Sequence, residues 1–218
     1  MKKYKIIISL IINLIISMIT TGIVVSYFLG NTGPLLKYGY ESFRFFTTDS
    51  NVIAAAASIS VIISDIMILR GKINTYPKYV RIFKYIGTVS VMLTFCTVML
   101  FLIHIYGPSA LLSGTSFHMH FAAPLLSLIS FCFIENDQKI SFVGTLTGIV
   151  PMFIYAVIYI VNVVFIGEEN GGWMDFYSFN SNGTWYITAV IMLCATYLIS
   201  IIILLVHNLT SEKLHKLN

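Results

Sequence analysis

The sequence predicts an all-α polytopic membrane protein, a six-transmembrane-helix bundle that forms a single domain over residues 1–218. The first observation is the composition, since 57% of the residues are hydrophobic and only 10% are charged. A soluble domain carries about 25% charged residues, so a water-soluble fold of this chain would expose far too much apolar surface. The second is that the apolar stretches lack strict two-residue alternation, which argues against an outer-membrane barrel.

Six stretches are long and apolar enough to cross a bilayer, which takes about 20 mostly apolar residues in a helix. The predicted spans are Ile6–Leu29, Phe45–Leu69, Tyr85–Tyr106, Phe117–Ile134, Ile140–Ile166 and Trp185–Val206. The first span follows Lys2, Lys3 and Lys5, as in a signal peptide, but its apolar run is too long and no small-residue cleavage site follows. We therefore expect this span to be retained as an anchor helix.

The distribution of Lys and Arg predicts the orientation of these spans. With the N-terminus inside, all but two of the 13 Lys and Arg residues fall on the inner side, and only Lys37 and Arg44 fall outside. The inner set is Lys2, Lys3, Lys5, Arg70, Lys72, Lys78, Arg81, Lys84, Lys139, Lys213 and Lys216. The positive-inside rule then places both termini in the cytoplasm of a cell-membrane protein.

The net charge and the cysteines argue against nucleic-acid binding and against redox chemistry at paired thiols. The formal net charge of +4 does not indicate a nucleic-acid partner, because the cations lie in loops between apolar spans. The cysteines lie within predicted spans and form no CxxC pair, so we expect Cys96, Cys132 and Cys194 to pack rather than react. Nothing in the pattern calls for a metal or another cofactor.

Two apolar segments open with polar residues that could carry out chemistry, and both open on the outer side. The segment FFTTDSN holds Thr47 and Thr48, either of which offers a hydroxyl. The segment SFHMHFAAP holds His118 and His120, either of which offers an imidazole. Such side chains are costly inside a bilayer, so they tend to mark a site. We expect Thr47 and His120 to face each other across a cavity at matched depth.

The second span carries a polar stripe at its outer mouth. Positions three and four apart share one face of a helix, so Thr47 lies on the same face as Ser50 and Asn51. Below them the run Ala54–Ala57 is small, which lets another helix backbone approach closely. An alternative interpretation is that the Thr-Thr-Asp run caps the helix, where such side chains satisfy free backbone amides.

Proline predicts an irregular helix beside the imidazole. Pro124 lies four residues after His120 and has no N–H, so the carbonyl of His120 loses its helical partner and we expect a kink there. Pro151 does the same to the carbonyl of Thr147 in the fifth span. His118 points roughly away from His120, and it suits a solvated position at the level of the lipid headgroups.

Threonine and histidine suit each other in ester hydrolysis. A hydroxyl is a poor nucleophile at neutral pH, but an imidazole can take its proton as it attacks a carbonyl and then protonate the leaving alcohol. Backbone amides or the side chain of Asn51 would stabilise the oxyanion. No GxSxG elbow is present, so an ordinary α/β-hydrolase is not expected. The Thr and His segments, together with their resemblance to a hydrolase family, predict an intramembrane lipid-ester hydrolase that works among membrane lipids on an amphiphilic lipid ester.

Two short motifs also resemble a known family. The pattern F-T-x-x-S-N at Phe46–Asn51 and the pattern H-x-x-x-P-L at His120–Leu125 are similar to bacterial six-helix membrane proteins, distant relatives of the androgen-induced protein family. Its animal members are threonine hydrolases of fatty acid esters of hydroxy fatty acids, with a catalytic Thr and His. The aromatic stretch Trp173–Phe179 looks like that group too. It lies in the loop Gly167–Thr184, which we expect to cover the outer mouth.

The resemblance implies a role for several residues of this chain. Thr47 matches the nucleophile and His120 matches the base. The supporting or substrate-binding set is Thr48, Ser50, Asn51 and Pro124. Thr48 is an extra hydroxyl, so the choice between the two threonines stays open. The Ser-Asn step is missing from the animal pattern, so the substrate stays open as well.

Two alternatives remain. A metal-dependent lipid hydrolase would draw its ligands from His104, His118, His120 and Asp49. His-x-His is not the i, i+4 pair that two ligands on one helical face need. A non-enzymatic protein for lipid binding, transport or sensing would use Asp65 as a polar relay. We expect Asp65 instead to snorkel toward Arg70 or Lys72, and no internal repeat supports transport.

Overall fold

The computed structural model describes residues 3–29 and 39–216, and all regular structure in those residues is helical. Six helices are long and apolar enough to cross a membrane, which confirms the predicted six-helix, all-α architecture. These spans cover Lys3–Leu29, Phe46–Leu69, Lys78–Tyr106, Gly114–Ile134, Phe142–Ile166 and Trp185–Ser211. Lys37, one of the two cations predicted outside, falls outside the described residues.

Three of the six spans are single α-helices and three change their winding along their length. The continuous ones are α1 (Lys3–Leu29), α2 (Phe46–Leu69) and α9 (Trp185–Lys216). The third span joins α3 (Lys78–Thr97), a π-helical turn Val98–Leu102 and α4 (Ile103–Tyr106). The fourth joins α6 (Gly114–Phe117), a π-helical turn His118–Ala122, α7 (Ala123–Ile129) and a second π-helical turn Ser130–Ile134. The fifth joins a 3₁₀ segment Phe142–Ile149, α8 (Val150–Ile160) and a π-helical turn Val161–Ile166.

Two of the changes in winding coincide with prolines. The π-helical turn that contains His120 ends directly before α7, and Pro124 lies in the first turn of α7. A π turn joins a carbonyl to the N–H five residues on, so it passes over the N–H that proline lacks. In the fifth span the 3₁₀ segment gives way to α8 at Val150, with Pro151 in its first turn. The predicted disturbance at both prolines is therefore a change of helix type.

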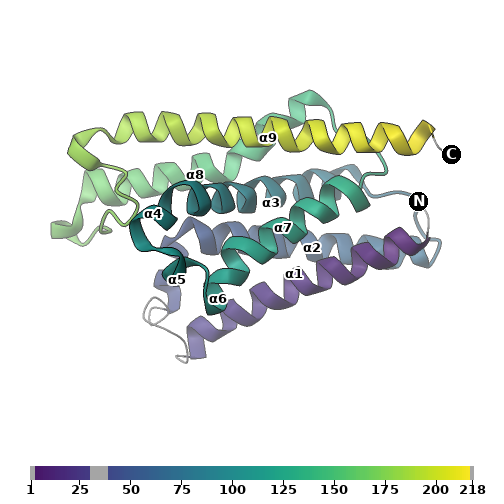
Figure 1. Cartoon of the computed structure of the whole chain (residues 1–218), viewed down its shortest axis with the longest axis horizontal. Helices are drawn as coiled ribbons and strands as arrows, with labels where there is room; N and C mark the ends of the chain where they lie inside the picture. The colour runs from purple at the N-terminus through teal and green to yellow at the C-terminus, as the bar shows by residue number, and fades with distance from the viewer. Residues whose placement is uncertain (1–2, 30–38, 217–218) are drawn as a thin grey trace.

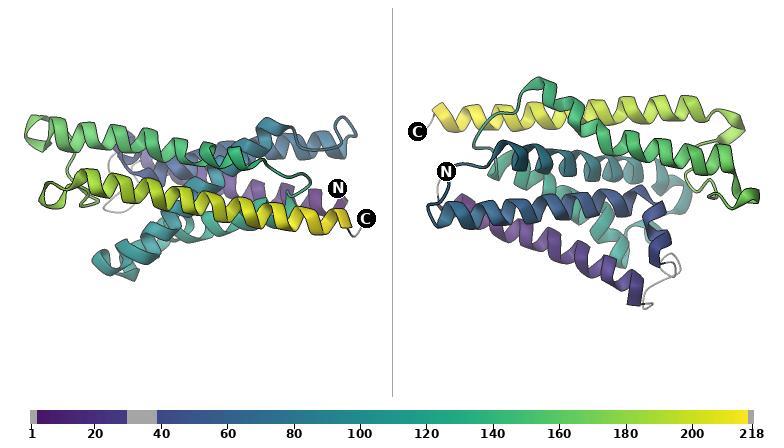
Figure 2. Two further views of the ribbon diagram at one scale, coloured as in Figure 1. Left: turned by 90° about the horizontal axis from the view of Figure 1, so that it is seen from above. Right: turned by 180° about the vertical axis from the view of Figure 1, so that it is seen from behind.

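The short segments and loops gather mainly at one end of the bundle. Figure 1 shows both termini at one end, which we call the termini end. The opposite end, called the far end, carries the 3₁₀ segment Gly39–Arg44, α4, α5 (Pro108–Leu111), α6 and the loop between the fifth and sixth spans. Figure 2 shows α1 and α9 on opposite sides of the bundle, with α3 between them. This central place agrees with burial, since 56% of the apolar window of the third span is buried against 22% for each of the last two.

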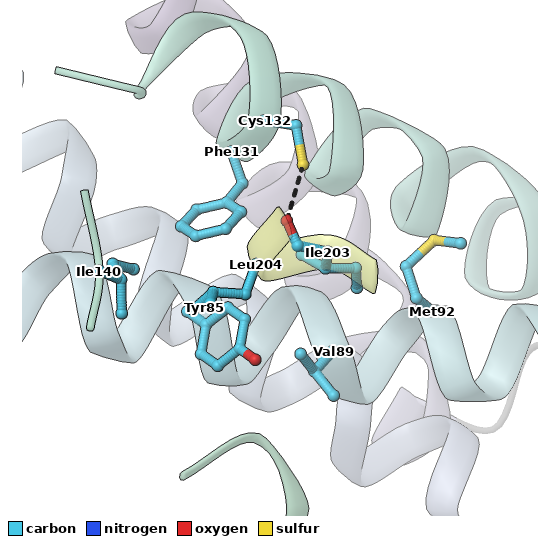
Figure 3. Close-up of a cluster of buried hydrophobic side chains, with 8 residues drawn as sticks. All are labelled: Tyr85, Val89, Met92, Phe131, Cys132, Ile140, Ile203 and Leu204. Atoms are coloured by element: carbon cyan, nitrogen blue, oxygen red, sulfur yellow. Dashed lines mark hydrogen bonds between the residues drawn. The ribbon is translucent and has the colours of Figure 1, made fainter. Parts of the chain in front are cut away.

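An apolar cluster packs the central helix against the helices on its α9 side. Tyr85, Val89 and Met92 of α3 meet Ile203 and Leu204 of α9 (Figure 3). Phe131 and Cys132 close the cluster from the end of the fourth span, and the Cys132 thiol lies 3.8 Å from the carbonyl oxygen of Ile203. Cys132 is 0% exposed and packs as predicted, whereas Cys96 is half-buried and Cys194 is exposed.

On its other side α3 approaches α2 very closely. Gly87 faces the small run of α2, and a Cβ at Gly87 would lie 3.0 Å from Cα of Ala54 and 3.3 Å from Cβ of Ala57. Small residues let helix backbones approach in this way when no hydrophobic force drives helices together in lipid. The prediction that Ala54–Ala57 receives another helix is confirmed, and the partner is α3.

Many polar side chains of the bundle are buried, and many large apolar side chains are exposed. Buried polar residues follow one face of each of the first three helices: Ser9, Asn13, Ser17 and Thr20 on α1, Ser50, Asn51, Ser58, Ser64 and Asp65 on α2, and Lys84, Thr88, Ser90 and Thr94 on α3. Large apolar side chains of α8 and α9 are exposed, among them Phe153, Ile191 and Leu205. Lipid solvates such a surface, whereas water would not, and the polar interior supplies hydrogen bonds between helices.

Candidate functional site

The predicted nucleophile lies in the first turn of α2. The residue at the N-cap position of this helix is Phe45, and no side chain caps it. Thr47, Thr48 and Asp49 are already inside the helix, so the alternative that they serve as its cap is wrong. The free amides of the first turn are partly satisfied by the backbone, since the amide of Thr48 donates to the carbonyl of Phe45 at 3.0 Å.

The two threonines meet different neighbours. Thr48 is 3% exposed and faces the hydroxyl of Tyr27 on α1. Thr47 is half-buried, and its side chain faces the hydroxyl of Tyr177 in the loop between the fifth and sixth spans. Burial raises the pKa of Tyr177 to about 12, so its hydroxyl keeps its proton at neutral pH. Thr47 therefore has the Tyr177 hydroxyl as a hydrogen-bond partner, which the sequence did not reveal.

The polar stripe below Thr47 is a local network. The hydroxyl of Ser50 contacts that of Thr94 on α3 at 2.8 Å, which ties α2 to α3. The Nδ2 of Asn51 donates to the carbonyls of Thr47 at 2.8 Å and Met119 at 3.1 Å. This leaves the Oδ1 of Asn51 buried with no partner. Because the free atom is an acceptor, Asn51 has no donor left for an oxyanion, so its predicted role is wrong in this arrangement.

The loop between the fifth and sixth spans folds over the start of α2, as predicted. The rings of Phe176 and Phe45 lie 4.5 Å apart between their centroids. Tyr159 of α8 holds the loop in place, because its hydroxyl donates to Asp175 at 2.8 Å and accepts from the amide of Tyr177 at 3.1 Å. The carboxylate of Asp175 also accepts the amides of Phe179 and Asn180, at 2.7 and 2.8 Å. These bonds fix Tyr177 next to Thr47.

His120 is half-buried in the π-helical turn before α7, with one ring nitrogen engaged. Its Nδ1 lies 2.8 Å from the carbonyl oxygen of Leu111, at the end of α5. A carbonyl can only accept, so Nδ1 carries the proton of the neutral ring and Nε2 keeps its lone pair. This is the tautomer that a general base needs. His118 is exposed, which agrees with its predicted place at the headgroup level.

The structure brings Thr47 and His120 to the same end of the bundle with separate partners. Tyr177 packs on the apolar cluster formed by Val98, Leu102 and Leu111, and Leu111 is also the residue that accepts from His120. Tyr177 thus contacts Thr47 on one side and the cluster that holds His120 on the other. Pro124 is buried one turn below His120.

A metal alternative gains no geometric support. Within residues 3–29 and 39–216, no group of three or more His, Cys, Asp or Glu side chains is arranged to hold a metal ion. Among the four proposed ligands, His120 is held by a backbone carbonyl and His118 is exposed. The four proposed ligands therefore do not form a metal site in the described part of the chain.

Two predictions about charged residues at the termini end are wrong. Asp65 is 0% exposed and bonds to Ser9 and Tyr76, so it does not snorkel toward Arg70 or Lys72. Lys84 is 1% exposed and lies inside α3, which begins at Lys78 and not at Tyr85. Hydropathy ends a span at its first charge, but side-chain hydrogen bonds from a neighbouring helix can hold a charge within the bundle. These partners come from distant parts of the chain, so no local pattern in the sequence indicates them.

The six apolar helices around a polar interior define a multi-pass helical membrane protein. No known protein family, curated protein or solved structure matches this chain. The fold and the arrangement of individual side chains are therefore what bears on its function.

Proposed function

We propose that this protein is an intramembrane lipid-ester hydrolase, with Thr47 as nucleophile and His120 as general base. The observation that carries the proposal is the 2.8 Å contact between Nδ1 of His120 and the carbonyl of Leu111. It orients the ring and leaves Nε2 as the basic atom, at the same end of the bundle as the Thr47 hydroxyl. An imidazole oriented through its second nitrogen is the usual partner of an activated hydroxyl.

The chemistry runs in two steps. Nε2 of His120 takes the proton of Thr47 as Oγ1 attacks the ester carbonyl, and the same proton then passes to the leaving alcohol. Water next attacks the acyl-threonine while His120 accepts its proton. His120 then returns that proton to Oγ1 of Thr47 as the ester bond breaks and the fatty acid leaves. For this the two side chains must approach within hydrogen-bond reach when substrate binds, a tightening that catalytic pairs commonly show.

Tyr177 is the proposed oxyanion donor in place of Asn51. Its hydroxyl faces Thr47, and its raised pKa of about 12 keeps it protonated. A preorganised donor at the developing negative charge is the strongest single contribution in this type of reaction. The substrate is an amphiphilic lipid ester whose acyl chains lie among the helices while its ester reaches the far end. No cofactor takes part in this mechanism.

The far end is proposed to face away from the cytoplasm of the cell membrane. Arg70, Lys72 and Lys139 are in loops at the termini end. Arg44 lies at the far end, where Glu41 pairs with it at 3.0 Å. This bias follows the positive-inside rule.

Labelling with a fluorophosphonate probe tests the proposal. The purified full-length protein should be labelled in lipid vesicles, and Thr47→Ala should abolish labelling while Thr48→Ala, the matched control, keeps it. His120→Ala should slow labelling strongly, because nucleophile and base act as a unit, and His118→Ala should not. Melting temperatures show whether each variant folds. Labelling that survives Thr47→Ala would refute the assignment. A folded wild type that binds lipid but turns over no ester would leave a lipid-binding role in its place.

A second candidate is the non-enzymatic class of transport or sensing proteins. One observation favours it: charged side chains buried among the helices at the termini end, which the hydrolysis mechanism does not use. Intramembrane ionisable residues commonly mark ion or proton pathways.

A further inference from the structure

Three ionisable side chains from three different spans lie buried together at the termini end. Asp65 of α2 is 0% exposed, Lys84 of α3 is 1% exposed and Glu135, directly after the fourth span, is 3% exposed. Ser9 and Asn13 of α1 connect them through hydrogen bonds. Burying charges is expensive unless each is paired and hydrogen-bonded. The hydrogen bonds of each group therefore show which one has a polar atom without a partner.

Asp65 is fully satisfied as a carboxylate. Its Oδ1 accepts from the hydroxyl of Tyr76 at 2.5 Å, and its Oδ2 accepts from the hydroxyl of Ser9 at 2.8 Å. Burial, followed by the charges of Glu135 and Asp65, raises the pKa of Tyr76. Tyr76 therefore keeps its proton and acts as a donor. Both oxygens of Asp65 have a neutral donor, so its negative charge is stabilised without a further proton.

Lys84 uses two of the three N–H groups of its ammonium. It donates to the Oδ1 of Asn13 at 2.6 Å and to the hydroxyl of Ser58 at 3.1 Å. The Nδ2 of Asn13 in turn donates to the Oε1 of Glu135 at 2.6 Å. Asn13 thus relays the positive charge of Lys84 to one oxygen of Glu135.

Glu135 differs because one of its carboxyl oxygens has hydrogen-bond partners and the other has none. Oε1 accepts from Asn13, from Ser130 and from Ser9, the last at 3.2 Å. Oε2 is buried and has no partner. An ionised oxygen in that position would be buried with no protein donor, which costs several kcal/mol in a typical case. A proton on Oε2 removes the charge and turns the orphan acceptor into a donor.

A small cavity lies beside Glu135 and supplies the room for exchange. It has a volume of about 10 Å³, on the order of the space that one water molecule occupies. Its walls are Val61, Tyr76, Val80, Arg81, Lys84, Phe131 and Glu135. Arg81 reaches from this wall to an exposed position, where it donates to the carbonyl of Lys139 at 3.3 Å. The cavity therefore lies close to the surface of the termini end.

We propose that Glu135 is a proton-binding site, whose Oε2 takes up and releases one proton through the cavity on the termini-end side. On uptake an O–H bond forms on Oε2 and a hydronium ion in the cavity becomes water; on release the reverse occurs, with no change of oxidation state. The Ser9 hydroxyl has one proton for two carboxyls, so its bond can move toward Glu135 when that group is ionised.

Charged and titratable groups from every packed element surround the site. They are Lys5 of α1, Asp65 of α2, Tyr76 and Asp137 of the adjoining loops, Arg81 and Lys84 of α3, Cys132 of the fourth span, and His207 of α9. His207 has both ring nitrogens on the backbone carbonyls of Phe131 and Gln138, at 2.9 and 3.1 Å. Burial raises the pKa of Asp137, whose Oδ2 accepts the amide of Tyr76 at 3.1 Å. Among these groups, Oδ1 of Asp137 and Nε of Arg81 are also buried without a hydrogen-bond partner, and Oε2 of Glu135 is the orphaned carboxyl oxygen on a residue that lines the cavity.

Infrared difference spectroscopy of the purified full-length protein in lipid vesicles tests this proposal over a pH series. We expect one protonated-carboxyl band at neutral pH, which disappears as the pH is raised. Labelling glutamate side chains with ¹³C should shift the band, and labelling aspartate side chains should not. This comparison uses the unmodified sequence, so it gives an answer even if a variant fails to fold.

Substitutions then assign the band to one residue. Glu135→Gln should remove it, whereas Glu169→Gln, at an exposed glutamate of the far-end loop, should leave it unchanged. A folded protein without any such band, or a band that shifts with labelled aspartate, would overturn the proposal. A band that responds to Na⁺ at constant pH would also overturn it, because the site would then bind a metal cation.

Discussion

Replacing Tyr159 with Phe should loosen the loop that covers Thr47. The hydroxyl of Tyr159, a residue that is 1% exposed, donates to Asp175 at 2.8 Å and accepts from the amide of Tyr177 at 3.1 Å. Phe keeps the ring and its packing, so the change removes both bonds and little else. A hydrogen bond to a charged group contributes about 1.5–3 kcal/mol, and an orphaned buried amide costs about 1–3 kcal/mol more.

The expected magnitude is smaller than the sum, because the Asp175 carboxylate keeps two backbone amides and lies only half-buried. We expect the free energy of loop opening to fall by about 2 kcal/mol, which corresponds to a roughly 30-fold larger equilibrium population of the open loop. Hydrogen exchange measures this directly at the amides of Phe179 and Asn180, which Asp175 protects.

The control is Tyr186→Phe, at a tyrosine of α9 that is 55% exposed, and it should leave exchange unchanged. Amides in the middle of α2 serve as an internal reference in both variants. Unchanged protection of Phe179 and Asn180 in Tyr159→Phe would refute the reasoning. Faster exchange across the whole bundle would refute it too, because the hydroxyl would then stabilise the fold and not the loop.

Two further predictions concern the bundle and its orientation. Gly87→Leu should destabilise the protein by about 1–3 kcal/mol through overpacking, because its Cβ alone would lie 3.0 Å from Cα of Ala54; Gly22→Ala, with no atom within 4 Å, is the matched control in a melting experiment. In a cysteine-free background, Glu169→Cys should react with an impermeant thiol reagent on intact cells and Lys72→Cys should not; the opposite pattern would invert the proposed topology.

The sequence by itself determined the class of fold. Its apolar stretches set the six spans, because a helix in lipid must satisfy its backbone internally and needs a fixed length to cross the bilayer. It also located the small face of Ala54–Ala57 and the two disturbed prolines, because helix packing and proline geometry act over a few residues. For the candidate site it supplied Thr47 and His120 by motif, and it placed both at one end of the bundle.

Only the tertiary structure decided which side chains meet. Tyr177 reaches Thr47 from a loop far along the chain. Leu111 fixes the tautomer of His120 through its backbone carbonyl, and any residue type at that position could supply a carbonyl, so the sequence does not reveal the contact. Asp65 and Lys84 look like the polar ends of spans in the sequence, yet they are buried. Ser9, Asn13 and Tyr76 bring donors and acceptors that offset the cost of burial. Whether a charge faces solvent or the interior depends on hydrogen bonds from other helices, and those exist only once the helices have packed.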